Sequence, residues 1–218
     1  MANLFKKQNT KNNKYVAFSF DDGPNEKITL QILKTLKKHN ARATFFLVGS
    51  RIENYTISKN IYKKYNCEIG NHTWMHDDMI DYTENFIYDS VKTCQDVIKS
   101  AFDTDAKLMR APGGNFSSKL LSALKKLGLC SIHWSLDSED WLINDVDIIV
   151  ENVVGKIKDG DIVLMHDKNE TTTKALDIIL NKLKKQGYCF VTVSELFEIK
   201  NIDLKPGTIY KTASKQHD

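Results

Sequence analysis

The feature that most constrains the fold is a regular alternation between short apolar runs and longer segments with helical periodicity. The run YVAFSF at residues 15–20 is typical of a buried strand, and residues 28–39 place their apolar side chains on one helical face. The run ATFFLV at 43–48 then resumes the strand pattern. Strands that alternate with helices predict a parallel sheet covered by helices.

The same alternation continues along most of the chain. Further strands are expected at 67–72, 108–111, 130–136, 161–166 and 189–193. Further helices are expected at 51–65, 83–102, 117–127, 145–157 and 171–186, with Thr83 as the N-cap of the second. About seven strand–helix units result, so we predict an α/β fold of the distorted (β/α)7 barrel type in a single domain. An open doubly wound sheet is the competing topology.

The two ends of the chain differ from this pattern. Residues 1–14 are polar and lack the apolar core of a signal peptide, and no stretch is long and apolar enough to span a membrane. Residues 201–218 are also polar, and we expect much of this tail to be loosely held. The predicted division is therefore an N-terminal segment at 1–14, a catalytic domain at 15–200 and a tail at 201–218.

Charge and cysteine content exclude some classes of protein. The 31 basic and 28 acidic residues are interspersed and give a net charge of +3, which argues against a nucleic-acid binder. Cys67, Cys94, Cys130 and Cys189 form no C-x-x-C pair. Three of them begin apolar runs, which favours small buried side chains, and a disulfide cannot be established from spacing alone.

Two adjacent carboxylates follow the first expected strand, in the sequence SFDDGP at 19–24. Neighbouring residues that leave a strand diverge, so Asp21 and Asp22 can take different roles, one as a metal ligand and the other as a base. A polar turn is the alternative, because Asp, Gly and Pro all favour turns.

A pair of histidines follows the third expected strand, in the sequence HTWMH at 72–76. His72 and His76 lie on one face if this segment is helical, and can then share one cation. Only six histidines occur in the chain, so a close pair favours metal binding. We interpret His39, His133 and His217 as structural.

Two later regions also place polar groups at strand ends. Arg110 precedes a Gly pair in RAPGG at 110–114, where it can clamp a carboxylate while backbone N–H groups approach a substrate oxygen. Taken alone, this motif favours a surface arginine before a turn. His166 ends the buried run DIVLMH, after the acidic sequence DSEDW at 137–141, and is a candidate general acid or base if a carboxylate orients its ring.

Together these sequences resemble one known family. The ordered set SFDDGP, HTWMH, RAPGG, DSEDW and LMH is similar to the five motifs of the polysaccharide deacetylases, the NodB homology domain of carbohydrate esterase family four. The resemblance runs from about residue 15 to residue 196, and all five motifs fall in order at strand ends.

The resemblance implies a metal-dependent hydrolase. It implies that Asp22, His72 and His76 hold one divalent ion in a site left open for water and substrate. We expect zinc, with cobalt, nickel and manganese as alternatives that the same ligands accommodate.

The resemblance also implies the catalytic roles. Asp21 is the expected base and is held by Arg110, while His166 is the expected general acid and is oriented by Asp137. The pocket for the acetyl methyl group is expected from Trp141 and Leu164, and an oxyanion contact from the Gly113 N–H.

One departure from the family concerns the third motif. Ala111 stands where the family often has proline, and Gly113 stands where it often has an aromatic residue. The Gly113 N–H is still available, but without an aromatic side chain at this position a sugar ring has no surface to stack on there.

The expected activity is removal of acetyl groups from N-acetylglucosamine residues of a polysaccharide. Peptidoglycan is favoured because a Lys-, Asn- and Ile-rich chain suggests a low-GC bacterium, and chitin oligomers are possible. An O-acetyl xylan esterase is the alternative, and a non-catalytic glycan-binding domain is a third hypothesis. A wall polymer favours an extracellular or cell-envelope protein that has lost a signal or anchor over a cytoplasmic one, and we expect a monomer.

Overall fold

The computed structural model describes residues 13–55 and 60–214. Its strands are β1 Lys14–Gly23, β2 Ala43–Leu47, β3 Glu68–Asn71, β4 Leu108–Met109, β5 Cys130–Ile132, β6 Leu136–Asp137, β7 Ile162–His166, β8 Tyr188–Val191 and β9 Ile209–Tyr210. Its α-helices are α1 Ile28–Lys38, α2 Gly49–Asn54, α3 Ile61–Lys64, α4 Glu84–Phe102, α5 Ser118–Leu127, α6 Val146–Val154, α7 Glu170–Lys185 and α8 Val193–Ile199.

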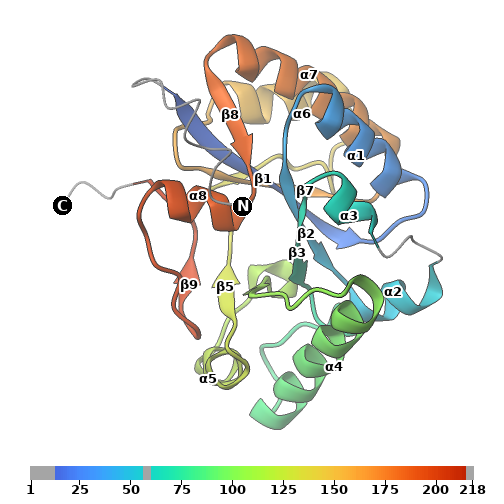
Figure 1. Ribbon diagram of the computed structural model, residues 1–218, viewed down its shortest axis with the longest axis vertical. Coiled ribbons are helices and arrows are strands. Elements are labelled where there is room, and N and C mark those ends of the chain that lie inside the picture. Colours follow the sequence, from blue (N-terminus) through green and yellow to red (C-terminus); the bar gives the residue numbers. More distant parts are fainter. Residues whose placement is uncertain (1–12, 56–59, 215–218) are drawn as a thin grey trace.

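The strands form one parallel sheet in the order β6-β7-β1-β2-β3-β4-β5-β9, with β8 also paired to β1 (Figure 1). The order β1 to β5 follows the chain, whereas a doubly wound sheet reverses direction part-way. The strands β7 and β8 return to β1, as in a barrel, but β6 and β9 at the two ends of the order do not pair with each other within the described segments. The predicted α/β fold and distorted barrel are confirmed.

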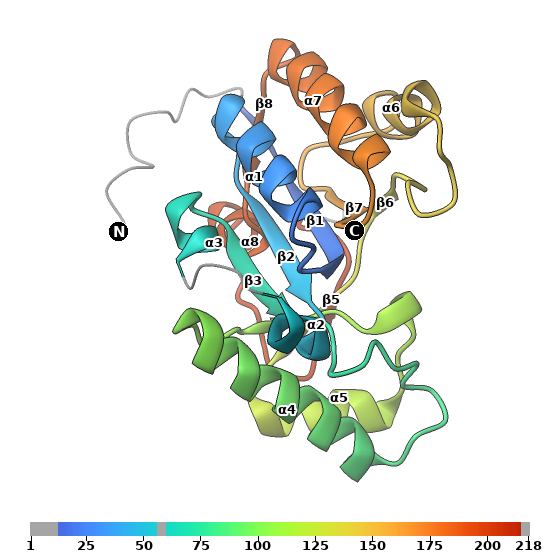
Figure 2. The same cartoon turned by 90° about the vertical axis from the view of Figure 1, so that its right-hand side faces the viewer.

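The helices pack outside the sheet in pairs. Figure 2 shows α4 beside α5 at one end of the molecule and α6 beside α7 at the other, with the strands between them. Beneath the helices, Phe45 stacks on Phe20 with a centroid distance of 5.1 Å and also contacts Tyr62, which meets Phe102 edge-on. Burial of each such side chain stabilises the fold by about 1.5–3 kcal/mol, so this aromatic row fixes the central strands.

Several helix ends follow the sequence signals. The Thr83 hydroxyl accepts a hydrogen bond from Phe86 N at the start of α4, as predicted. The expected helix at 51–65 is instead two short helices, α2 and α3, separated by residues outside the described part. The short helix α8 was not predicted, although Thr192 and Glu195 form a capping box at its start.

The expectation of a loosely held tail is wrong for residues 201–214. Tyr210 lies on β9, which pairs with β5, and its ring meets Phe197 of α8 at 5.2 Å. Ala213 is fully buried. The polar composition of the tail gave no sign of this packing, because the contacts are made by a strand of only two residues and a few apolar side chains. Residues 215–218 lie outside the described part of the chain.

The four cysteines are free thiols. Cys94 and Cys130 are buried, and Cys67 and Cys189 are partly buried. Burial raises the pKa of the Cys67 thiol to about 12, so this side chain stays neutral and packs as a small apolar group.

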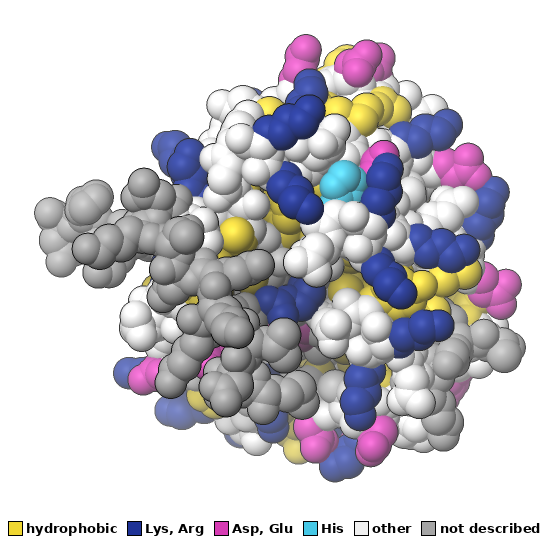
Figure 3. Space-filling view, turned by 45° about the horizontal axis from the view of Figure 1, so that its top comes forward, with side chains coloured by type: hydrophobic (Ala, Val, Ile, Leu, Met, Phe, Trp, Pro, Cys, Tyr) yellow, Lys and Arg dark blue, Asp and Glu magenta, His cyan; other side chains and the backbone are white. Residues whose placement is uncertain are grey.

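Where the face in Figure 3 is not covered by grey atoms, Lys and Arg side chains lie among acidic, apolar and uncharged ones. Among the helices that the structure describes, none has the length and apolarity needed to cross a membrane.

Candidate active site

The strand register brings the predicted site residues to the carboxyl-terminal edge of the sheet. Asp21 on β1 lies directly opposite His166 on β7. The pairing of β3 with β4 ends one residue before His72 and Arg110, so these two side chains also leave the sheet side by side. Since parallel strands end at a common edge, residues from distant parts of the sequence converge here.

Asp22, His72 and His76 form a compact cluster. One ligand atom from each lies within 4.8 Å of the others. Asp22 Oδ1 is 3.0 Å from His76 Nε2 and 3.8 Å from His72 Nε2, and the two rings have a centroid distance of 5.0 Å. The structure therefore brings together the three side chains predicted to hold a metal.

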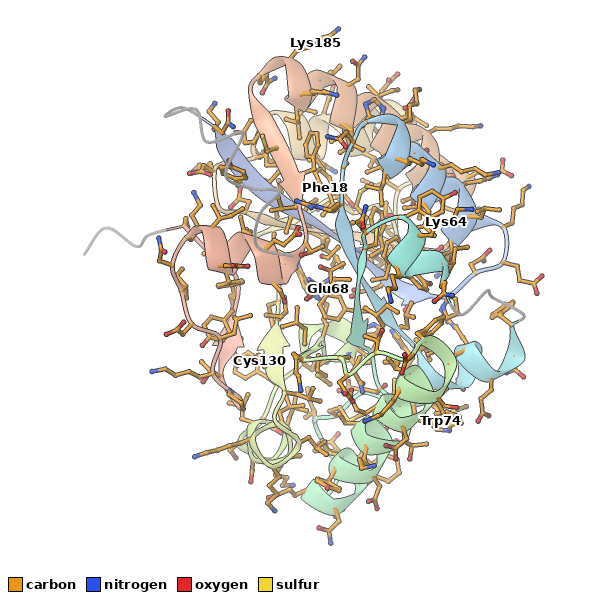
Figure 4. The ribbon with its side chains drawn as sticks, viewed as in Figure 1. Phe18, Lys64, Glu68, Trp74, Cys130 and Lys185 are labelled. Atoms are coloured by element: carbon orange, nitrogen blue, oxygen red, sulfur yellow. The ribbon has the colours of Figure 1, made fainter. Side chains whose placement is uncertain are left out.

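The segment between the two histidines is a loop and not a helix, unlike the helical arrangement considered from the sequence. Thr73 and His76 both have left-handed backbone conformations, with φ of 66° and 63°. Gly49 N and Ser50 N donate hydrogen bonds to the carbonyls of Thr73 and Trp74. Trp74 lies against α2 and α4 (Figure 4), so packing holds the loop in place.

Hydrogen bonding and burial prepare His72 as a ligand. Its Nδ1 lies 2.7 Å from the carbonyl oxygen of Arg110, which can only accept, so Nδ1 carries the proton and Nε2 is free to coordinate. Burial lowers the pKa of His72 and keeps the ring neutral. Burial opposes ionisation of Asp22, but His76 and His72 outweigh it and hold the pKa of this carboxyl well below its usual range.

This cluster fits a divalent cation. Asp22 Oδ1 is buried and has no hydrogen-bond partner among the described residues, although His76 is close to it. Buried polar atoms are nearly always satisfied, so a carboxylate oxygen that faces two imidazoles without a hydrogen bond is typical of a metal site. Two imidazoles and one carboxylate form a three-ligand set that suits zinc and related ions.

Asp21 is held by a buried arginine. Arg110 is fully buried, and its Nη1 donates to Asp21 Oδ1 at 2.8 Å. Its Nε and Nη2 donate to the carbonyls of Ile132 and His133, and the guanidinium lies 4.3 Å from the ring centroid of Phe46. The alternative of a surface arginine before a turn is therefore wrong. The other carboxylate oxygen, Asp21 Oδ2, lies 3.7 Å from His72 Nε2, on the side of the metal cluster.

His166 is oriented by Asp140, and the prediction that Asp137 orients it is wrong. His166 Nδ1 lies 2.7 Å from Asp140 Oδ1, while Asp140 Oδ2 accepts from His166 N and from the Thr172 hydroxyl. Asp137 turns back into its own loop, where Oδ1 accepts from Glu139 N. Asp140 follows the end of β6 by three residues, and both of its carboxyl oxygens reach His166 at the end of β7.

Sequence reasoning missed Asp140, although the motif DSEDW contains it as a second aspartate after Asp137. Burial alone favours a neutral His166 ring. The hydrogen bond and charge of Asp140, together with Asp21 and Asp22, outweigh burial and raise the pKa of His166. A raised pKa keeps the proton on the ring nearer to neutral pH, as a general acid requires.

Of the three predicted pocket residues, Gly113 and Trp141 follow strand ends, and Leu164 lies two residues before the end of β7. Leu164 is buried in β7, whereas Trp141, directly after Asp140, is 55% exposed. Gly113 is in a short 3-10 turn, Pro112–Gly114, with a φ of 64° that favours glycine. Their contacts with an acetyl group stay predictions.

The structure describes two of the three histidines interpreted as structural. His39 Nε2 is 2.6 Å from Asp177 on α7. His133 is buried, and burial together with Arg110 lowers its pKa to about 4. His217 lies outside the described residues.

Comparison with known proteins agrees with this geometry. Residues 8–132 match the family model described as polysaccharide deacetylase. The chain belongs to the polysaccharide deacetylase family. A peptidoglycan-N-acetylglucosamine deacetylase of Bacillus cereus is 40% identical over 200 residues, which cover 87% of this chain and 91% of that protein.

Other relatives in this family differ in length and named substrate. The peptidoglycan-N-acetylglucosamine deacetylase PgdA of Listeria monocytogenes is 38% identical over 86% of this chain, but the match covers only 40% of that longer protein. The structure of a family 4 acetyl xylan esterase from Clostridium thermocellum, solved with a cobalt ion, is 32% identical. It has a TM-score of 0.84 and covers 91% of this chain and 98% of that one.

Proposed function

We propose that this chain is a metal-dependent deacetylase that removes acetyl groups from N-acetylglucosamine residues of a polysaccharide, with peptidoglycan as the favoured polymer. The observation that carries the proposal is the convergence of three units at one sheet edge. These are the Asp22–His72–His76 cluster, the Asp21–Arg110 pair and the His166–Asp140 pair. The names of the relatives support peptidoglycan and an action in the cell envelope.

Each unit has a distinct role in amide hydrolysis. When bound by the three-ligand cluster, a divalent cation supplies Lewis acidity that polarises an acetyl carbonyl and makes water easier to deprotonate. Asp21 accepts the proton from the attacking water, while Arg110 fixes the orientation of its carboxylate. His166 donates a proton to the departing sugar nitrogen, and Asp140 holds the ring and stabilises its charged form.

Removal of metal is expected to abolish acetate release from N-acetylglucosamine oligomers, and added zinc is expected to restore it. The His76→Ala variant should not be restored, because the cluster loses one of its three ligands. The His39→Ala variant removes a histidine outside the cluster and should recover with zinc like the unchanged chain. Acetate is measured enzymatically before and after addition of zinc to chelator-treated protein.

The same assay separates the competing functions. Acetate released from acetylated xylan but not from N-acetylglucosamine oligomers or peptidoglycan would favour the O-acetyl esterase, an activity named for one structural relative. Tight glycan binding without any acetate release, with zinc bound, would favour the glycan-binding domain.

The assignment of Asp140 has its own pH test. In a plot of kcat against pH, the Asp140→Asn substitution is expected to move the fall in kcat on the alkaline side to lower pH. His166 must be protonated to donate, its protonated fraction falls as pH rises through its pKa, and loss of the Asp140 charge lowers that pKa. Asp137→Asn is the matched control and should shift this fall less. A larger shift in Asp137→Asn would restore Asp137 as the partner of His166.

A further inference from the structure

Asp167, directly after His166, is a buried carboxyl with no role in the proposed chemistry. It is 2% exposed. Its Oδ2 accepts a hydrogen bond from the Thr29 hydroxyl in the first turn of α1, whereas Oδ1 is buried without a hydrogen-bond partner among the described residues. An unsatisfied buried polar atom costs about 1–3 kcal/mol, so its presence at this edge of the sheet calls for a reason.

Asp167 lies against the turn that begins with Asp22, the carboxylate of the proposed metal cluster. Asp167 N donates to the carbonyl of Asp21 at 2.8 Å. A Cβ atom at Gly23 would lie 2.7 Å from Asp167 Oδ2, so the carboxyl packs directly against the backbone after Asp22. Asp22 itself has a φ of 72°, a left-handed conformation that costs a non-glycine residue about 1–2 kcal/mol. Neighbouring groups must therefore hold this turn in place.

The Thr29 hydroxyl extends the contact to the whole segment between β1 and α1. It accepts from Asn25 N at 2.8 Å while it donates to Asp167. Asn25 Oδ1 in turn accepts from the amides of Lys27 and Ile28 at the start of α1. Asp167, at the end of β7, is thereby joined by hydrogen bonds to Asp21 before the turn and to Thr29 after it.

We propose that Asp167 is a positioning residue for the metal ligand Asp22. Its carboxyl, anchored by Thr29, packs under Gly23 and maintains the left-handed turn that directs the Asp22 carboxylate toward His72 and His76. In this role Asp167 acts through Asp22 and takes no part in the reaction itself. The proposal rests on the proposed function only in that the cluster binds a cation.

Zinc affinity tests this role without any substrate. The variants Asp167→Ala and Thr29→Val are each expected to bind zinc about 10–100-fold more weakly, the usual cost of losing a residue that orients a ligand. Asp167→Asn keeps an oxygen that accepts from Thr29 and is expected to remain close to the unchanged chain. Affinity is measured by competition with a chromophoric chelator on folded, metal-stripped protein, with circular dichroism as the check on folding.

A matched control is available at the opposite edge of the sheet. The Thr44 hydroxyl donates to Glu68 Oε2 at 2.7 Å, a partly buried hydroxyl–carboxyl pair at the start of β2 and β3 (Glu68 is labelled in Figure 4). Thr44→Val removes a hydrogen bond of the same kind and is expected to lower thermal stability without weakening zinc binding.

The outcomes separate this proposal from the proposed function. If Asp167→Ala and Thr29→Val fold and bind zinc as tightly as the unchanged chain, or if Thr44→Val weakens zinc binding equally, the positioning role is overturned. If Asp167→Ala does not fold, Thr29→Val and the rescue by Asp167→Asn decide the question. An unchanged chain that binds zinc but releases no acetate contradicts the proposed function alone, and one that binds no zinc contradicts both.

Discussion

Substitution of Asp21 by asparagine is expected to lower kcat for deacetylation of N-acetylglucosamine oligomers by about 10²- to 10⁴-fold. Asparagine has nearly the same shape and keeps an oxygen that can accept from Arg110, but it cannot take a proton from water. Because Asp22, His72 and His76 are unchanged, zinc affinity should stay close to that of the original chain. The measurement is steady-state acetate release together with zinc competition on the same preparation.

The control for this variant is an aspartate of the same chain outside the site. Asp96→Asn, on the exposed face of α4 where Asp96 pairs with Lys92, should leave kcat and zinc binding unaltered. Turnover close to the original in Asp21→Asn would contradict its role as the base. Loss of zinc together with loss of turnover would instead make Asp21 part of the ligand set.

The His166→Ala variant is expected to hydrolyse amide substrates with a kcat about 10²- to 10⁴-fold lower, while still binding zinc. The reason is that an amine is a poor leaving group unless it is protonated as the C–N bond breaks. An aryl acetate such as 4-nitrophenyl acetate has a leaving group that needs no proton, so its hydrolysis should fall much less. Comparison of kcat/KM for the two substrates measures this difference.

This comparison also distinguishes the two proposed roles. Asp21→Asn should be impaired on both substrates, since both need an activated water. Equal losses in His166→Ala on amide and aryl ester would show that His166 does not act as the acid for the leaving group.

The main elements of the fold could be predicted because each strand and helix has its own local signal. The strand at 15–20 is an apolar run interrupted only by Ser19, and the helix at 28–39 has one apolar face, so β1 and α1 could be predicted from the sequence pattern. The tail could not be predicted in this way. Its position depends on the pairing of β9 with β5 and on the burial of Ala213, which are contacts between distant segments with no periodic pattern.

The candidate site shows the same division between local and distant information. The resemblance to the polysaccharide deacetylases predicted that Asp22, His72 and His76 meet, and they do. The choice between Asp137 and Asp140 depended on the path of the chain after β6, which spacing alone does not specify. Asp167 gave no signal at all, because its importance comes from a buried contact with Thr29 and Gly23.

The central place of β1 in the sheet has a consequence for the order in which a growing chain can acquire activity. Asp21 is among the first described residues to be synthesised, but its neighbour across the sheet, His166, belongs to β7 in the last third of the chain. A ribosome-bound chain therefore has its three proposed metal ligands before it has its proposed general acid. Because Asp167 directly follows His166, we expect tight binding of an ion, like catalysis, to wait until β7 has emerged and docked beside β1.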